Sequence, residues 1–301
     1  MIKKISISVA MIYIIAGSAL GQYTTIGYRL KGKVARLETK MYTQTKQGEK
    51  HLVNETIITF DTLGRITAKQ DIKQNLYYQY KYRTNSTLLT PDSIVIKSGN
   101  KNESVIAISY TASGEKTSEI QISDNVAIKR TDISYDSTTN TKTETIIQLP
   151  SNTPTQQIIS VYDQDGCKIK ECFYVYDNDN YNHPRITHSI ASVYDIESNL
   201  MQTITYSYND EGVVSRCVDT YNKRGKVETR NCYTEDDFLF QSQTSKYDEH
   251  NNLKKNTTTY NSEDESITNT TTSKYQYDHY GNWIELKFMQ YTTERNIIYY
   301  E

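Results

Sequence analysis

Hydrophobic and polar residues alternate along most of the chain, which is the period-two pattern of half-buried β-strands. In the clearest case, Ile284, Leu286 and Phe288 share one face of a predicted strand, while Glu285 and Lys287 share the other. Tyrosine pairs spaced two residues apart also place both rings on one face, at Tyr78 and Tyr80, Tyr174 and Tyr176, Tyr206 and Tyr208, and Tyr275 and Tyr277. Little of the chain has the periodicity of an amphipathic helix, so the pattern predicts an all-β protein.

A short repeat separates these predicted strands. Each copy begins with Tyr or Phe, continues into a turn with Asp or Asn and often Gly, and leads into an alternating run. Such residues tolerate the positive φ that tight hairpin turns need. In the second half, copies start 12 to 18 residues apart, at Tyr162, Tyr176, Tyr194, Tyr208, Tyr221, Tyr233, Tyr247, Tyr260 and Tyr277. Each copy predicts one strand and one turn, and successive strands should pair antiparallel.

The predicted fold is an antiparallel meander of these hairpin repeats, forming an extended sheet that twists or curls. Residues 157–301 carry the regular repeat, whereas 22–148 have longer predicted strands and more varied turns. Residues 149–156 hold two of the four prolines, and they form either a joint between two regions or a loop within one continuous sheet. We expect the segments Leu30–Tyr42 and Ile297–Tyr300 to cap the two ends of the sheet.

The first 21 residues have the features of a secretory signal peptide. Lys3 and Lys4 precede an apolar run, and small residues at Ala19 and Gly21 favour cleavage before Gln22. A buried N-terminal element and an uncleaved anchor are the alternatives. We expect a secreted protein, periplasmic or at the cell surface, with no membrane span in the mature chain. Cleavage takes the formal net charge from -2 to about -4, which disfavours a nucleic-acid partner.

The turn sequences resemble the YD repeat of the Rhs (rearrangement hotspot) family, whose core is Tyr-Asp-x-x-Gly followed by Arg or Asn and a strand. The motif positions here are Phe60, Asp61 and Gly64; Tyr162, Asp163 and Gly166; and Tyr277, Asp278, Gly281, Asn282 and Trp283. The chain also resembles short secreted YD-repeat proteins of the Bacteroidetes type. Those open with the Leu-Lys-Gly-Lys-Val segment seen here at Leu30–Val34, and close on Gly-Asn-Trp followed by Thr-Glu-Arg, seen here at Thr293–Arg295.

Large members of that family wind YD repeats into a β shell around a C-terminal toxin. This chain is far shorter and ends inside repeat-like sequence, so we expect no toxin domain and do not carry over toxin delivery. The resemblance implies the strand–turn repeat, a secreted location, and binding of a carbohydrate or a surface partner.

Sequence motifs for conventional catalysis are missing. There is no nucleophile elbow, phosphate-binding loop, dinucleotide fingerprint or zinc-protease motif, so we expect neither an enzyme nor a cofactor. His183 and His188 lie five residues apart, on opposite faces of a strand, which disfavours a metal site. Acidic pairs such as Asp236 and Asp237 lie in predicted turns, whereas a glycosidase needs two carboxylates facing each other across a cleft.

The four cysteines give one prediction about pairing. If Arg224 and Gly225 form a two-residue hairpin loop, the register counted outward from it places Cys217 opposite Cys232 on the adjacent strand. We expect these two to form a disulfide in a secreted protein, with four free thiols as the alternative. Cys167 and Cys172 lie on opposite faces of one strand and should not bridge each other.

Three functions remain open. The first is non-enzymatic binding of a glycan or a surface protein through the sheet, for which Tyr277 and Trp283 are named as binding positions, although we expect structural roles for both. The second is a structural protein that pairs with another chain through a sheet edge. The least favoured is a glycoside hydrolase built from turn acids.

Overall fold

The computed structural model describes residues 28–301 apart from 46–47, 84–88, 100–102 and 178–179. The expected signal peptide (1–21) and the side chain of His183 lie outside the described part. Strands are the only regular elements in that part: β1 Val34–Gln44, β2 Lys50–Phe60, β3 Ile66–Asp71, β4 Leu76–Lys81, β5 Ser93–Ser98, β6 Ser104–Tyr110, β7 Lys116–Ser123, β8 Val126–Asp136, β9 Thr141–Gln148, β10 Thr153–Tyr162, β11 Lys168–Asp177, β12 Asn180–Tyr194, β13 Leu200–Asn209, β14 Gly212–Tyr221, β15 Val227–Thr234, β16 Leu239–Tyr247, β17 Leu253–Asn261, β18 Ser266–Tyr277, β19 Trp283–Phe288 and β20 Tyr291–Tyr299. No helix within the described ranges is long and apolar enough to cross a membrane.

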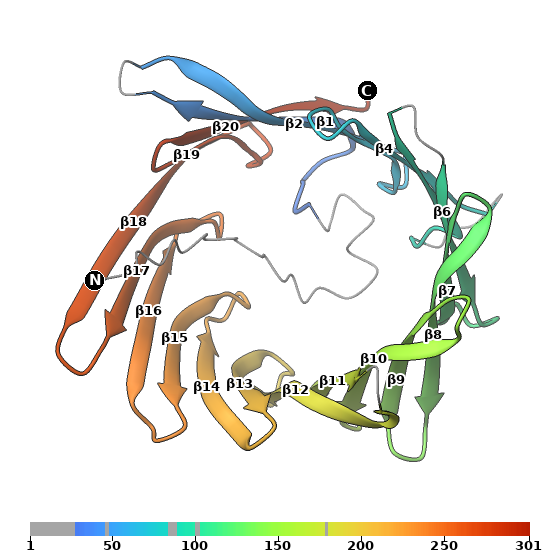
Figure 1. The fold of residues 1–301 in the computed structure, drawn as a ribbon. Helices are drawn as coiled ribbons and strands as arrows, with labels where there is room; N and C mark the ends of the chain where they lie inside the picture. Colours follow the sequence, from blue (N-terminus) through green and yellow to red (C-terminus); the bar gives the residue numbers. More distant parts are fainter. Residues whose placement is uncertain (1–27, 46–47, 84–88, 100–102, 178–179) are drawn as a thin grey trace, which may run out of the picture.

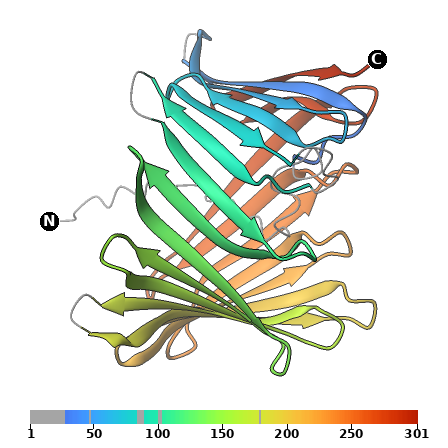
Figure 2. The ribbon, with the colours of Figure 1, turned by 90° about the vertical axis from the view of Figure 1, so that its right-hand side faces the viewer.

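The sheet closes into a 20-stranded barrel. Each strand pairs antiparallel with its neighbours in sequence, and β1 also pairs with β20, which places Leu37 between Ile58 and Ile297. Figure 1 shows the resulting ring, and Figure 2 shows the strands inclined to its axis. The prediction of an all-β antiparallel meander is confirmed, but the expected open, extended sheet is wrong. The first and last strands meet each other along a seam and do not cap opposite ends.

A recurrent β-bulge supplies curvature that the sequence did not reveal. The register shifts by one residue at the aromatic residue before each motif turn, at Phe60, Tyr110, Tyr162, Tyr194, Tyr221, Tyr233, Tyr247 and Tyr277. A bulge bends its strand and increases the local twist. Repeated around the sheet, these bends bring β20 back to β1, because a sheet of many twisted strands must curl, split or close.

Residues 149–156 do not separate two sheets. Strands β9 and β10 pair directly across this segment, with Gln148 opposite Thr153, and a cis peptide bond joins Leu149 to Pro150 in the turn between them. The described strands of the 22–148 region and those of the 157–301 region therefore belong to one continuous sheet.

The hydrophobic core is local and lies inside the barrel at the seam. Residues 28–33 turn inward from the start of β1 (Figure 1), and Leu30 packs against Leu37, Ile58, Phe60 and Ile66, which are at most 3% exposed. Burying such side chains contributes about 1.5–3 kcal/mol each. The strongest apolar packing in the described part thus lies where the two ends of the sheet join.

Beyond the seam, the inner wall is apolar at the buried Ile94, Ile108 and Ile133 in the first half of the chain and largely polar in the second half. Alternation along the paired strands places several small or acidic buried side chains on the same face as Leu37, namely Ser160, Thr203, Asp219, Ser245, Thr258 and Ser273. The outer face carries a row of threonines that lie opposite one another on five consecutive strands, Thr220, Thr229, Thr244, Thr257 and Thr270. Charged pairs such as Lys40 with Glu55 also lie on the outer face.

Removal of residues 283–301 tests the closure. This deletion eliminates β19 and β20, so β1 and β18 each lose a partner strand and the seam core loses Ile297 and Tyr299. We expect the shortened protein to aggregate and to lose its cooperative thermal transition, as followed by size-exclusion chromatography and circular dichroism. A control that lacks only the exposed Glu301 should behave like the intact chain. A monomeric, cooperatively folding deletion variant would contradict the closure.

Candidate functional site

The Tyr-Asp motif forms a five-residue turn with a fixed set of hydrogen bonds. In the copy at residues 278–282, the backbone N–H of Asp278 donates to the carbonyl of Asn282 (2.9 Å), and the Gly281 N–H donates back to Asp278 (3.0 Å). The Asp278 carboxylate also accepts from the N–H groups of Tyr280 and Asn282, both at 2.9 Å. The acid therefore holds its own turn closed. The same pattern recurs at 61–65, 163–167, 195–199 and 222–226, with Asn as the acceptor in the last.

Most of these turns lie at one end of the barrel, here called the Tyr-Asp rim. It is the end at which even-numbered strands finish, because the meander alternates direction at every hairpin. Its motif turns are residues 61–65, 111–115, 163–167, 195–199, 222–226, 248–252 and 278–282. The start of β1 and the end of β20 also lie at this rim.

Tyrosine hydroxyls tie neighbouring hairpins together along this rim. Four of them donate to the carbonyl of the residue that opens the preceding strand, in the pairs Tyr82 to Ile66, Tyr135 to Lys116, Tyr194 to Lys168 and Tyr247 to Val227. The next two copies reach the neighbouring turn itself: the Tyr277 hydroxyl donates to the Asp248 carboxylate, and the Tyr299 hydroxyl donates to Asp278. These bonds join neighbouring hairpins at six places along the rim and hold the tyrosine side chains that make them.

At the seam, Asn282 holds the segment that precedes β1. The side-chain amide of Asn282 accepts from the Lys31 N–H (2.7 Å) and donates to the Lys31 carbonyl (2.9 Å) and to the Tyr299 hydroxyl (2.7 Å). Asn282 is 3% exposed. The Gly-Asn-Trp and Leu-Lys-Gly-Lys-Val segments, 251 residues apart at this contact, therefore meet directly.

Two glycines permit this close approach. Gly32 has φ +83°, and a Cβ there would lie 3.1 Å from the Tyr299 ring. Gly281 has φ +78°, and a Cβ there would lie 3.3–3.4 Å from the Lys31 Nζ and the His250 ring. A larger residue at either position would be strained in its backbone and crowded in its surroundings.

An aromatic cluster, here called the rim cluster, stands on this framework. It consists of His279, Tyr280 and Tyr299. The His279 and Tyr280 ring centroids are 4.0 Å apart, and those of Tyr280 and Tyr299 are 4.4 Å apart. His279 is exposed, and 44% of the Tyr280 surface is open to solvent. Behind the cluster, His250 packs on Tyr277 with centroids 4.0 Å apart.

A small hollow of about 170 Å³ lies directly beside the rim cluster. Gly32 lines the hollow, and a Cβ at this position would lie 3.1 Å from the Tyr299 ring and 3.4 Å from the Tyr280 ring, so the hollow adjoins the cluster. The remaining lining residues are Lys33, Val34, Asp61, Thr62, Leu63, Gly64 and Tyr300. The Tyr300 hydroxyl donates to the Phe60 carbonyl, which fixes that ring at the seam.

The two predicted binding positions, Tyr277 and Trp283, have internal contacts. The Tyr277 hydroxyl is held by Asp248 and by the Asn252 amide (2.9 Å), and burial together with the Asp248 bond raises its pKa. The Arg295 guanidinium stacks 3.5 Å from the Trp283 ring centroid. Burial lowers the pKa of Arg295 to about 10. Both aromatic residues thus support the seam, while the exposed ring of this motif copy is Tyr280.

Sequence reasoning placed His279 in an exposed turn but gave no binding role to His279, Tyr280, Lys31 or Lys33. The motif itself contained a usable signal. Asp278 and Gly281 make bonds that close the turn, so the two residues between them are the tip of the hairpin, and in six of the seven rim copies both tip residues are exposed. An aromatic pair at those two positions is therefore available for binding.

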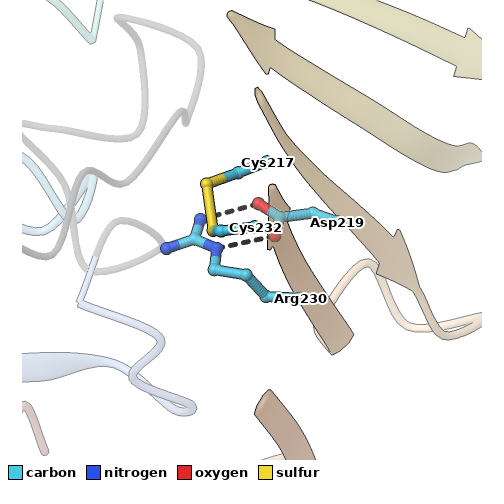
Figure 3. The surroundings of a disulfide bond; sticks show 4 residues. All are labelled: Cys217, Asp219, Arg230 and Cys232. Atoms are coloured by element: carbon cyan, nitrogen blue, oxygen red, sulfur yellow. Dashed lines mark hydrogen bonds and ion pairs between the residues drawn. A yellow bond between two sulfur atoms is a disulfide. The ribbon is translucent and has the colours of Figure 1, made fainter. Parts of the chain in front are cut away.

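A disulfide joins Cys217 to Cys232 on the inner wall, with an S–S distance of 2.06 Å. Beside it, the Arg230 guanidinium donates to both carboxylate oxygens of Asp219, at 2.7 and 2.6 Å (Figure 3). The Asp219 side chain is 6% exposed and that of Arg230 is 44% exposed, so the carboxylate of this pair is buried while the guanidinium side chain reaches solvent. A disulfide spanning 15 residues contributes about 3 kcal/mol by restricting the unfolded chain.

The loop between these strands differs from the two-residue hairpin that we assumed. It runs over residues 222–226, and Tyr221 lies opposite Val227. The bulge between Thr220 and Tyr221 shifts the register back by one residue, so Cys217 still lies opposite Cys232. Cys167 and Cys172 are free.

Other candidate chemistry is structural. His188 stacks on Phe173 with centroids 4.0 Å apart, and burial lowers its pKa. Among the residues whose placement is known, no group of three His, Cys, Asp or Glu side chains could hold a metal ion.

The chain was compared with known proteins. No family model matches it, and no curated protein matches its sequence. Among solved structures, it aligns with a chain of the Photorhabdus luminescens Tc holotoxin pore at 13% identity and TM-score 0.42, covering 83% of this chain and 14% of that one. A porin-like protein from Bacteroides uniformis aligns at 8% identity and TM-score 0.39 over 88% of this chain and 96% of that one, and one from Bacteroides vulgatus aligns at 11% and 0.33 over 90% and 99%. At these scores the alignments assign neither a family nor a function.

Replacement of Asn282 by Ala should destabilise the barrel. The change leaves the part-buried N–H and C=O of Lys31 without their partner, so we expect the free energy of unfolding to fall by about 1–3 kcal/mol. Asn199 is the matched control, because it occupies the same turn position but is exposed and its side chain contacts only its own turn. Urea unfolding should show a much smaller loss for Asn199→Ala, and equal losses would refute the clamp.

The bond between Tyr299 and Asp278 should appear in the pH dependence of stability. Burial alone would raise the pKa of Asp278, but the Tyr299 hydroxyl and the backbone N–H groups of Asn282 and Tyr280 outweigh it and lower the pKa below 3.8. A carboxyl lowered in this way stabilises the fold above pH 3.8, and that contribution is lost as the pH falls through the folded value.

In Tyr299→Phe the pKa of Asp278 should move back toward 3.8. We therefore expect the stability gap between wild type and this variant to be largest near neutral pH and to shrink on acidification, as measured by urea midpoints between pH 7 and pH 3. Tyr260→Phe, a change at an exposed ring in β17, is the control. A gap that stays constant across this range would show that the bond does not hold the carboxylate.

Proposed function

We propose that the protein is a secreted, non-enzymatic β-barrel that binds a glycan at the seam of the Tyr-Asp rim. The observation that carries this proposal is the rim cluster, in which the exposed His279 and Tyr280 pack with the half-buried Tyr299 on a hydrogen-bonded framework beside a hollow. Aromatic rings offer a flat apolar face with polar edges, which suits the alternating C–H and hydroxyl surfaces of a sugar ring.

The framework favours binding because it is already ordered. Tyr299 is fixed by Asp278 and Asn282, and the turn that carries Tyr280 is closed by four internal hydrogen bonds. A ligand that stacks on these rings needs to immobilise few protein groups, so less of the interaction energy is lost to ordering.

The turn acids support a non-enzymatic role. Asp61, Asp163 and Asp278 each use a carboxylate oxygen to close their own turn. Asp61 also pairs with Arg65 at 2.7 Å. This bond occupies the second oxygen of Asp61, and the second oxygen of Asp278 accepts from the Tyr299 hydroxyl. With both oxygens engaged, these two acids are poorly placed to protonate a glycosidic oxygen or to attack a sugar carbon, as a glycoside hydrolase requires.

The outer wall and the N-terminal sequence support an aqueous location outside the cytoplasm. Ion pairs such as Arg36 with Glu38 and Lys40 with Glu55 lie on the outward face, where a lipid-spanning barrel carries an apolar band. Together with the signal-like residues 1–21, this favours a secreted, periplasmic or surface-attached protein.

A surface protein is the second candidate ligand for the same cluster, because exposed tyrosines are also typical of protein interfaces. Assembly through sheet edges is less well supported. That function needs an unpaired strand, and each of the twenty described strands pairs on both sides.

A glycan-array screen of residues 22–301 tests the proposal. We expect at least one reproducible glycan, with affinity reduced tenfold or more in the double variant His279→Ala/Tyr280→Ala. Tyr260→Ala is the matched control, since its ring is similarly exposed, 46% against 44%, but lies toward the other end of the barrel. Absence of any glycan ligand for folded wild-type protein would exclude this function, and a pull-down from envelope extract would then test for a protein ligand.

A further inference from the structure

Two unpaired cations flank the rim cluster. Lys31 and Lys33 are both exposed, and within the described part of the chain neither forms an ion pair. The Lys31 side chain passes over the 278–282 turn beside His250, and Lys33 lines the hollow. One lysine therefore stands beside the aromatic rings, and the other stands where the hollow begins.

The neighbouring acids have polar partners already. Asp248 accepts from the Tyr277 hydroxyl, Asp278 from the Tyr299 hydroxyl, and Asp61 from Arg65. These bonds orient the carboxylates into the rim framework, although Asp248 and Asp278 keep their negative charge. Neither lysine has a carboxylate within ion-pair distance in the described part of the chain, so each ammonium group can pair with an anionic group of a ligand.

The placement of these cations is fixed by the backbone. The backbone N–H and C=O of Lys31 are both held by Asn282, and Lys33 follows two residues later, after Gly32. The side chain of Lys31 therefore starts from a fixed point, and that of Lys33 starts close to it. A cation anchored in this way loses less entropy when it pairs with a ligand than one on a mobile loop.

We propose that the ligand is an anionic sugar: one ring stacks on the rim cluster, and its acidic group lies toward the hollow between Lys31 and Lys33. This inference rests on the proposed glycan-binding function and adds the charge class of the ligand. The hollow of about 170 Å³ has space for roughly five waters at liquid density, which is enough for a carboxylate or phosphate group and part of a ring. The Asp61 carboxylate, turned toward Arg65, does not oppose such a group as a free acid would.

The test uses ligands that differ only in charge. Isothermal titration of residues 22–301 would compare α-1,4-digalacturonate with α-1,4-galactobiose, which has the same linkage and ring configuration but a neutral hydroxymethyl group. Galactose 6-phosphate against galactose forms a second arm that distinguishes a phosphate from a carboxylate. We expect at least tenfold tighter binding of the anionic member of one pair, and this preference should weaken between 20 mM and 300 mM salt.

The protein variants separate charge from stacking. Lys31→Gln/Lys33→Gln should abolish the preference and weaken binding of the anionic sugar about tenfold, while its affinity for the neutral sugar stays unchanged. The control Lys73→Gln/Lys129→Gln removes the same charge from exposed positions toward the opposite end of the barrel. His279→Ala/Tyr280→Ala should weaken both members of a pair.

The outcomes are distinct. Equal affinity for charged and neutral sugars, with no effect of the lysine variants, would overturn the charge inference and leave glycan binding intact. No binding of any of the four sugars, together with a negative glycan array, would overturn both. A preference for the anionic sugar that survives in Lys31→Gln/Lys33→Gln would place the charge recognition elsewhere and also contradict the inference.

Discussion

Pairing of β1 with β20 is the constraint that organises this barrel. A meander of hairpins leaves one unpaired edge at each end, and here the two edges satisfy each other, with Leu37 held between Ile58 and Ile297. The best-packed apolar cluster, the Asn282 clamp and the rim cluster all lie along this junction. Closure thus creates the candidate site, because the segment around Lys31 and the turn around Tyr280 belong to opposite ends of the chain.

Some residues of the Tyr-Asp motif hold the barrel framework together, and others are exposed at the surface. The aromatic residue marks a bulge and, in most copies on the rim, bonds to the neighbouring hairpin. The acid and the glycine close the turn. In the 278–282 copy, the side chains of the two residues between them take no part in these bonds, so these positions can vary. One repeat can therefore carry different chemistry at each tip, and the tip at His279 and Tyr280 is the aromatic one that adjoins the seam.

The sequence was sufficient for the class of fold but not for its closure. Alternation and turn residues predict the antiparallel meander, since both are local properties of eight- to thirteen-residue segments. Whether the ends meet depends on the accumulated bend of many bulges, which no single repeat reveals. The predicted pairing of Cys217 with Cys232 was correct even though the assumed two-residue hairpin was wrong. The 222–226 loop is longer than that hairpin, and the adjacent bulge restores the register between the two cysteines.

The same closure sets the order of events when the chain folds. Every other strand pairing joins neighbours in sequence and forms at little loop-closure cost, while the seam joins segments about 250 residues apart. Because the chain is synthesised from its N-terminus, one edge of β1 therefore stays unpaired until the last strand has been made. The interval between those two moments is when the sheet is most exposed to pairing with another molecule, and it ends only when β20 is in place.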